Sequence, residues 1–419
     1  MSEATILNPV EARSRSVNVY GWVMVGVAAV AMVATLPGRT HGLGMITERL
    51  LADPQLNLSR TGYGQMNFWA TLLGAFFCLG IGSCIDRFGI RRTLAVVMVG
   101  LGVVVLAMTK TTSPSILFVT IMLTRGFGQS ALSVVSIAIV GKWFDRNVSF
   151  PMAVYSILMA GGFIAAALIG RNYADLDWRA FWSAMGWAVL GLAVVLTVIA
   201  RDRTPSAAET SSEVGNVPGN DYTHGEAMRT PMFWVCSLSI SLYGMIVAGI
   251  SLFNESILVD QGFRKEVYYE SLALGTGMGV VAKMCAGLLG IYWPVNRLLS
   301  VALMLLAGSL VWLTQLASYQ DVVGYVIVSA LAGGMLTVLF FSAWPDLYGR
   351  AHLGKIQGIA QMMTVLASAI GPLIFAQTRE LAGSYHPLLW VLSACAALTA
   401  VIAWLTPSPR KQPQISGDV

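Results

Sequence analysis

Three basic side chains, Arg39, Arg125 and Lys283, fall inside long apolar stretches of the sequence, and no acidic residue occurs at comparable depth in those stretches. A charge in the apolar interior of a bilayer is costly, so such residues usually face a bundle interior or a water-filled cavity. Because the sequence supplies no counter-ion for these cations, a bound anion is the group that would neutralise them. We therefore predict a binding site for a small anion that includes these three residues.

Five further residues could complete such a site. Asn67, Tyr155 and Gln361 carry polar side chains within apolar stretches and are candidates for contact with the bound molecule. A polar residue in such a helix also commonly serves as a hydrogen-bonding partner for a neighbouring helix. Glu255 and His41 are titratable, so they are candidates for proton coupling.

The residue types that support enzymatic chemistry do not occur with the required spacing. We find no nucleophile paired with a base, no metal-ligand spacing and no glycine-rich loop that could hold phosphate. The cysteines number five and fall within or at the ends of apolar stretches, which argues against a disulfide framework. We therefore expect no enzyme activity, no cofactor and no bound metal.

The composition is that of a helical membrane protein with many spans. Of the 419 residues, 56% are hydrophobic and only 11% are charged, and the mean hydropathy is +0.69, far from the usage of soluble domains. The net charge is +5, but the basic residues are spread over short loops instead of forming one patch. We therefore expect the lipid bilayer as a partner and no nucleic acid.

Apolar stretches of the length needed to cross a bilayer recur along the chain in two sets of six. The first set lies at residues 18–46, 62–84, 93–109, 115–140, 151–172 and 179–200. The second set lies at residues 231–255, 268–290, 298–316, 322–344, 356–378 and 387–406. The segment between the sets is polar and rich in serine, glycine and asparagine, as flexible linkers are. The predicted division is an N-terminal half at 1–200, a cytoplasmic linker at 201–228 and a C-terminal half at 229–419.

Lysine and arginine are unevenly divided between the loops on the two sides of these spans. With the amino terminus inside the cell, the inner loops carry clearly more of them than the outer loops, as the positive-inside rule requires. We therefore expect a multi-pass protein of the cell membrane with both termini in the cytoplasm. We expect it to act as a monomer.

The two halves also resemble each other in sequence. The segment KWFDRNVSFPMAVYSILMAGG, which begins at Lys142, is similar to AWPDLYGRAHLGKIQGIAQMM, which begins at Ala343. Each starts in a basic loop with an aromatic residue and an aspartate, and each continues into the fifth span of its half. Internal repeats of this kind are found in transporters whose binding site lies near the bilayer midplane, between the repeats. The sequence therefore predicts an all-α membrane protein of twelve transmembrane helices in two pseudo-symmetric six-helix bundles.

The loop after the second span carries a specific pattern of charged residues. It reads GSCIDRFGIRR from Gly82 and is similar to the signature loop of the major facilitator superfamily, G-x-x-x-D-R-x-G-R-R. Asp86 can bond the end of a neighbouring helix. Its three arginines, Arg87, Arg91 and Arg92, can hold the inner membrane surface. We expect an ionic latch that breaks when the two halves move, and we expect it in one half only, since the corresponding loop at 290–297 lacks an acid.

Within that superfamily, the chain resembles the branch of monocarboxylate and oxalate/formate transporters. The resemblance covers nearly the whole length and rests on short motifs in the correct order: Tyr20-Gly21-Trp22, Pro37-Gly38-Arg39, Gly141-Lys142-Trp143-Phe144, Trp178-Arg179 and Val281-Ala282-Lys283. The last motif stands where that branch has Val-Ala-Arg, whose arginine is implicated in holding the substrate carboxylate. Lysine keeps the positive charge but not the planar fork of arginine. Proton-coupled members carry an aspartate one turn earlier, where this chain has Gly279.

This resemblance implies a secondary active transporter of a small organic anion, in particular a monocarboxylate, that works by alternating access as a proton symporter or an anion exchanger. Arg39 and Lys283, from opposite halves, would bind one anion between them. Arg125 resembles the fourth-helix arginine of proton-coupled drug antiporters, which suggests as an alternative a proton-driven exporter of drugs or metabolites. Arg125 could equally hold the helices together. A membrane sensor or receptor on a transporter fold is a further alternative, which counterflow measurements in liposomes would separate from a transporter.

Overall fold

The structure is a computed structural model, which describes residues 9–144, 148–171, 177–202 and 221–409. Every regular element in these ranges is a helix. Eleven helices of the described part are long and apolar enough to cross a membrane, and the apolar segment Val19–Val33 adds a shorter one. The prediction of an all-α membrane protein with about twelve spans is confirmed.

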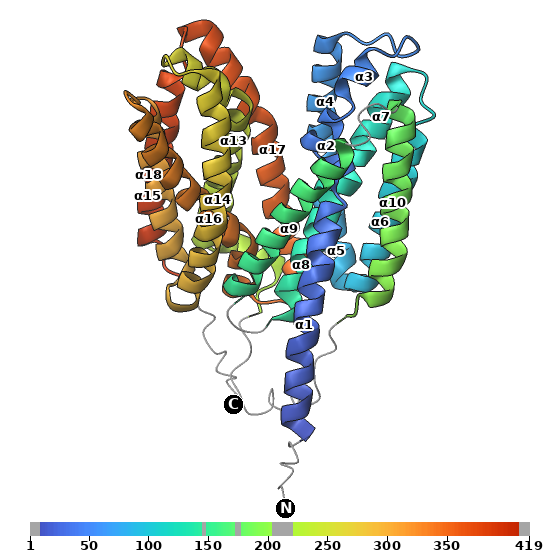
Figure 1. The fold of residues 1–419 in the computed structure, drawn as a ribbon. Coiled ribbons are helices and arrows are strands. Elements are labelled where there is room, and N and C mark those ends of the chain that lie inside the picture. Colours follow the sequence, from blue (N-terminus) through green and yellow to red (C-terminus); the bar gives the residue numbers. More distant parts are fainter. Residues whose placement is uncertain (1–8, 145–147, 172–176, 203–220, 410–419) are drawn as a thin grey trace, which may run out of the picture.

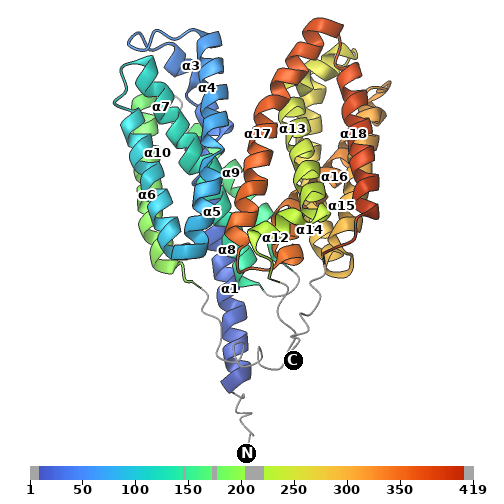
Figure 2. The ribbon, with the colours of Figure 1, turned by 180° about the vertical axis from the view of Figure 1, so that it is seen from behind.

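The helices form two bundles, which lie side by side in Figure 1 and, from behind, in Figure 2. The long elements of the first bundle are α1 (Pro9–Val33), α4 (Arg60–Gly74), α5 (Phe77–Phe88), α6 (Ile90–Met108), α7 (Pro114–Thr124), α8 (Ser133–Trp143), α9 (Ser149–Arg171) and α10 (Trp178–Ile199). Those of the second are α13 (Pro231–Asp260), α14 (Lys265–Tyr292), α15 (Val295–Leu313), α16 (Tyr319–Tyr348), α17 (Leu353–Ala382) and α18 (His386–Leu405). Each bundle encloses its own core of buried apolar side chains.

The predicted linker at 201–228 lies mainly in residues 203–220, outside the described ranges, so the three-part division remains a prediction. On both sides of this gap, the described residues form hydrogen bonds at the start of a helix. Asp202 accepts hydrogen bonds from the backbone N–H groups of Ile90 and Arg91 at the start of α6. On the other side, the short helix α12 (His224–Arg229) begins with a capping box between Thr223 and Glu226.

Three spans in the described ranges are not continuous α-helices: the second is interrupted between α4 and α5, and the first and fourth contain other types of helix. After α1, the chain forms the 3₁₀ helix η1 (Leu36–Gly38) and the short helix α2 (Thr40–Gly44), because Pro37 has no N–H to continue an α-helix. Between α7 and α8, residues Arg125–Leu132 form a π-helix, η2. Stretches of π-helix inside α-helices frequently occur at functional sites. The sequence predicted this span at 115–140 but gave no indication of its wider turn.

The two irregular segments touch each other through glycine. A Cβ atom on Gly38 would lie 2.9 Å from the Cα of Gly128, and one on Gly128 would lie 3.0 Å from the Cα of Gly38. Any larger residue at either position would push η1 and η2 apart. This close approach brings Arg39, which follows η1, to the same region of the bundle as Arg125, which begins η2.

At the end of the bundles opposite the termini, a loop is fastened to the start of α10. Asp53, which follows the short helix α3 (Thr47–Leu51), accepts a hydrogen bond of 2.9 Å from Trp178 Nε1 and forms an ion pair with Arg179. Burial alone would raise the pKa of Asp53, but hydrogen bonds from Trp178, the Gln55 backbone and Arg179, with the Arg179 charge, hold that pKa below its usual value. The Trp-Arg pair of the sequence motif thus anchors this loop.

The two bundles meet at the end from which the termini leave and diverge toward the opposite end (Figure 1). Near the termini, α5 crosses α17 so closely that a Cβ on Gly82 would collide with the backbone of Gly354. A symmetric contact joins α14 to α9, where Gly290 lies against Ser149. The structure is therefore a state closed on the side of the termini.

Candidate functional site

Arg39 lies inside the N-terminal bundle, where its partners among the described residues are all neutral. Its Nε donates to Thr35 Oγ1 at 2.7 Å, and its Nη2 donates to Ser133 Oγ at 3.1 Å and contacts Met32 Sδ at 2.9 Å. The guanidinium stacks over the ring of Phe163, 5.2 Å from its centre. These contacts hold the planar group in place without neutralising it.

Arg125 is still more buried, with 3% of its surface exposed. Its Nη1 donates to Gln129 Oε1 at 2.8 Å and to Thr40 Oγ1 at 3.1 Å, and its Nη2 donates to Asn67 Oδ1 at 3.1 Å. Its Nε has no hydrogen-bond partner among the described residues. One donor of a fully desolvated guanidinium is thus unused.

The two arginines form a positively charged region without a counter-ion. Arg125 bonds Thr40, the residue directly after Arg39, and the charge of Arg39 acts on Arg125. None of the ion pairs found in the described ranges includes either residue. Two like charges in a low-dielectric region repel each other strongly. An anion bound here would neutralise both guanidinium groups and reduce the repulsion between them.

Tyr155 lies on α9 between this region and the other bundle. Its hydroxyl forms a 2.8 Å hydrogen bond with Ser136, which in turn donates to the Ala28 carbonyl oxygen. Its ring packs edge-on against Phe341 of α16, with ring centres 5.2 Å apart. Tyr155 therefore connects α1, α8 and α9 and touches the C-terminal half.

Lys283 lies in the C-terminal bundle, on α14, where it lines a pocket formed with α13, α15 and α16. It takes part in no hydrogen bond or ion pair within the described residues. The backbone at Lys283 packs against Gly334 of α16, where a side chain would collide with Ala282 and with the Lys283 nitrogen. The third cation thus also lacks an acidic partner in the part of the chain that the structure describes.

Arg39 and Lys283 are not brought together in this state. On α9, Ser149 faces Gly290 and Ala153 faces Gly287 of α14, so the next turn puts Lys283 near the level of Ser156. Arg39 stacks on Phe163, which lies about 10 Å farther along the axis of α9. The structure therefore pairs Arg39 with Arg125 and places Lys283 across from them in the other half.

Gln361 and its neighbour Gln357 approach this region from α17. Gln357 is 1% exposed, and neither of its amide atoms has a partner among the described residues; the same holds for Gln361 Oε1. Gly358 of α17 packs on the Cys78 backbone of α5, so Gln361 reaches the level one turn earlier, where Gly74 packs on Arg125. Unpaired buried amides cost free energy, so this interface is suited to a polar ligand or to water.

Asp86 bridges the two halves at the end near the termini. Its Oδ1 accepts from Lys142 Nζ at 3.0 Å and from the Gly354 backbone N–H at 3.2 Å, and its Oδ2 accepts from the Lys355 N–H at 3.0 Å. The carboxylate therefore caps the N-terminus of α17, where the helix dipole favours negative charge. This is the type of contact expected for a latch.

The three arginines of the same loop do not cross to the other half in this state. Arg91 Nε donates to the Thr197 carbonyl at 2.9 Å, and Arg87 stacks over Phe88. Arg92 is exposed. These contacts stay within the N-terminal half, so among contacts of the described residues only Asp86 of the four joins the halves.

The C-terminal half supplies a related contact from an unexpected position. Its loop at 290–297 lacks an acid, but Asp346 near the end of α16 accepts from Ser149 Oγ, at the start of α9, at 3.4 Å. Ser149 Oγ also lies 3.3 Å from Ser342 Oγ. An acid from each half thus faces the start of a helix in the other half, and the interface is less one-sided than the loop sequence suggested.

The site contains partners that the sequence did not identify. The side chains of Glu255 and His41 lie outside the described part of the structure. Gln129 could have been found from its position four residues after Arg125, on the same helix face. Thr40 and Ser133 gave no signal, because serine and threonine are common in apolar helices.

Comparisons with known proteins agree with this architecture. Residues 11–372 match the family described as the Major Facilitator Superfamily. The tetracycline resistance protein, class E, of Escherichia coli is 24% identical over 350 residues, which cover 81% of this chain and 84% of that protein.

Among solved structures, transporters share the fold. The proton:xylose symporter XylE superposes with a TM-score of 0.70 at 16% identity, covering 93% of this chain and 96% of that one. The human organic anion transporter MFSD10 (TETRAN) gives a TM-score of 0.67 at 15% identity, covering 94% and 100%. With the family match over most of its length and the two-bundle fold, the chain belongs to the Major Facilitator Superfamily and is a multi-pass membrane transporter, not an enzyme.

Proposed function

We propose that this transporter carries a small organic anion, in particular a monocarboxylate. The observation that carries the proposal is that all three cations lie within the spans and have no acidic partner among the described residues. Among these residues, Arg39 and Arg125 bond only neutral groups, and Lys283 forms no hydrogen bond. Buried charges in proteins are normally paired or neutralised. A carboxylate that enters between the halves would supply the missing partner.

The placement of these cations suggests a mechanism. Arg39 and Arg125 belong to the N-terminal half and Lys283 to the C-terminal half, so an anion attracted by both sides favours their closure around it. A ligand shifts a conformational equilibrium by its difference in affinity for the two states. We infer that the anion binds first in the open state and more tightly when the halves close, as alternating access requires.

Coupling and orientation belong to the same proposal. Either proton symport or anion exchange is compatible with the arrangement, and exchange needs no titrating acid at Gly279. Glu255 and His41 remain the candidates for proton coupling. We also propose a monomer in the cell membrane with both termini in the cytoplasm, so that the described state is open to the outside.

Counterflow in liposomes tests the proposal. Purified protein is first screened for thermal stabilisation by small carboxylates at two pH values, and uptake of the stabilising compound is then measured. We expect Lys283→Ala to abolish uptake without loss of folded protein, whereas Lys110→Ala, at an exposed lysine after α6, transports normally. Undiminished uptake by Lys283→Ala would exclude Lys283 from the site, and the absence of any stabilising carboxylate would overturn the anion proposal.

A proton-driven drug exporter is the second candidate, favoured by the 24% identity to a tetracycline resistance protein. In that case tetracycline, and not carboxylates, would stabilise the protein and be transported. Uptake of tetracycline and of carboxylates, measured in the same liposomes with a proton gradient across the membrane, decides between the two candidates.

A further inference from the structure

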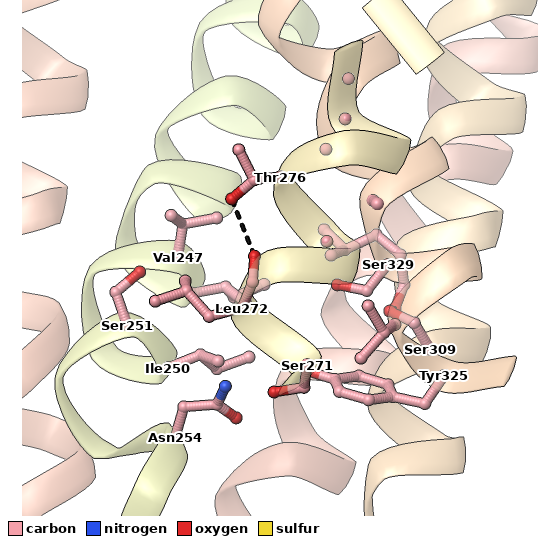
Figure 3. Close-up of a pocket in the computed structure, with 18 of the residues that line it drawn as sticks. Val247, Ile250, Ser251, Asn254, Ser271, Leu272, Thr276, Ser309, Tyr325 and Ser329 are labelled. Atoms are coloured by element: carbon pink, nitrogen blue, oxygen red, sulfur yellow. Dashed lines mark hydrogen bonds between the residues drawn. The ribbon is translucent and has the colours of Figure 1, made fainter. Parts of the chain in front are cut away.

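The pocket next to Lys283 has a composition that restricts its ligand further. Its volume is about 370 Å³, within the range of small-molecule sites. Figure 3 shows side chains of α13 and α14 around it, with Ser309, Tyr325 and Ser329 of α15 and α16 on the right. Thr276 and Leu272 are exposed on the α14 side, so the pocket is accessible.

The charged group in the pocket lining is positive. Lys283 is the cation of the pocket, and no aspartate or glutamate occurs among the described residues that line it. A positively charged or zwitterionic ligand would bring an ammonium group into a region that has no acid to neutralise it. The lining therefore favours a ligand with an anionic group and without a cationic one.

Most hydroxyl groups in the pocket lining already donate their proton to a backbone carbonyl oxygen. Thr276 donates its proton to the Leu272 carbonyl at 2.8 Å, which is the dashed line in Figure 3, and Ser271 donates to the Tyr268 carbonyl at 2.7 Å. Other lining hydroxyls donate to backbone carbonyls in the same way: Ser309, Thr337 and Tyr243. A hydroxyl has one proton and two lone pairs. As long as these bonds are kept, each of these oxygens can accept but not donate a hydrogen bond to a ligand.

An amide adds another acceptor. Asn254 Oδ1 is buried and has no hydrogen-bond partner among the described residues. Figure 3 shows the Asn254 amide and the Ser271 hydroxyl directed into the same space. Such an acceptor is costly to leave unpaired. The pocket thus offers one strong positive donor at Lys283 and a series of acceptors along its walls.

We propose that the transported anion is a hydroxylated carboxylate, whose carboxylate binds Lys283 and whose hydroxyl groups donate to the acceptors of this pocket. A plain alkyl carboxylate has no donors and would desolvate these oxygens without replacing their hydrogen bonds. Thr276 lies about 10 Å from Lys283 along α14, so a six-carbon chain that carries several hydroxyls can, together with the lysine side chain, bridge this distance. The inference rests on the proposed anion transport and specifies its substrate class.

The test compares gluconate with hexanoate, two carboxylates of equal chain length that differ in hydroxyl groups. Affinities are measured by calorimetry on the full chain in detergent. We expect gluconate to bind at least about tenfold more tightly than hexanoate. Thr276→Val and Thr337→Val remove one acceptor each and should reduce that ratio severalfold.

Thr378→Val is the matched control. Thr378 lies outside the pocket and also donates to the carbonyl four residues earlier on its own helix, at 2.8 Å. It should leave the ratio unchanged, and the thermal stability of each variant shows that it folds. Equal or tighter binding of hexanoate, or an equal effect of Thr378→Val, would overturn this inference and leave anion transport standing. Failure of every carboxylate in the stabilisation screen would overturn both.

Discussion

At the scale of the residue, the decisive property of Arg125 is that the group nearest to its guanidinium is a neutral amide and not a carboxylate. Gln129 Oε1 lies 2.8 Å from Arg125 Nη1, so Gln129→Glu would place a carboxylate there with almost no change in shape. This built-in counter-ion would compete with a bound anion. We expect Gln129→Glu to weaken carboxylate binding at least about tenfold, since a hydrogen bond to a charged group contributes about 1.5–3 kcal/mol.

Calorimetry on the variant measures this loss, and its melting temperature without ligand separates binding from folding. Gln315→Glu adds the same charge at an exposed site in the other half and should leave affinity unchanged. A Gln129→Glu variant that is more stable and binds as tightly as the parent chain would show that Arg125 only holds helices together.

The sequence identified the three cations because charge in an apolar stretch is conspicuous. It could not show that Arg39 neighbours Arg125, because their approach depends on the contact between Gly38 and Gly128. It also assigned Lys283 to a site shared with Arg39, whereas in this state the two lie at different depths. Which buried polar groups meet is decided by tertiary packing, which a single sequence does not record.

At the scale of the element, the loop after α3 depends on a carboxylate that titrates. The pKa of Asp53 is lowered in the folded protein, so its contacts with Trp178 and Arg179 stabilise the fold above the unfolded pKa of about 4 and are lost as pH falls through the folded value. We expect Asp53→Asn to lower the melting temperature by about 2 °C or more at pH 7.

Thermal unfolding followed at several pH values checks this. The difference between Asp53→Asn and the parent chain should shrink as the pH is lowered below about 4, because the stabilisation by the Asp53 carboxylate decreases below its unfolded pKa. Gln55→Ala, which removes a longer contact of 3.3 Å to the exposed side of Arg179, should have a smaller and pH-independent effect. A pH-independent loss in Asp53→Asn would contradict the role given to the carboxylate.

The spans themselves were predictable because about 20 apolar residues suffice to cross a bilayer. The π-helix η2 was not predictable. Its residues, RGFGQSAL, are compatible with an ordinary α-helix, and the wider turn is set by packing against Gly38 and Gly74. The irregular segments that carry the candidate site are thus the part of the fold that pattern alone misses.

At the scale of the whole molecule, the two halves are held in one state by contacts near the termini. Asp86 is central, because one carboxylate accepts from Lys142 of its own half and from two backbone N–H groups of α17. Asp346 and Ser149 make a weaker counterpart, at 3.4 Å. Rocking of the halves must break both contacts, so their strength sets the balance between the two states.

We expect Asp86→Asn to shift this balance toward the state open on the side of the termini. The variant keeps the shape and one oxygen acceptor but loses the charge, and charge-assisted hydrogen bonds are worth about 1.5–3 kcal/mol, or at least about tenfold in population. Spin labels at the exposed residues Lys110 and Tyr319, at the opposite end of the two bundles, would report the change in a cysteine-free background as a shorter distance in pulsed dipolar spectroscopy.

Arg92→Gln is the control. It removes an exposed charge of the same sequence motif without touching the other half and should leave the distances as in the parent chain. Identical distance distributions in Asp86→Asn and Arg92→Gln would mean that the close helix crossing at Gly82 and Gly354, and not the carboxylate, keeps this side closed.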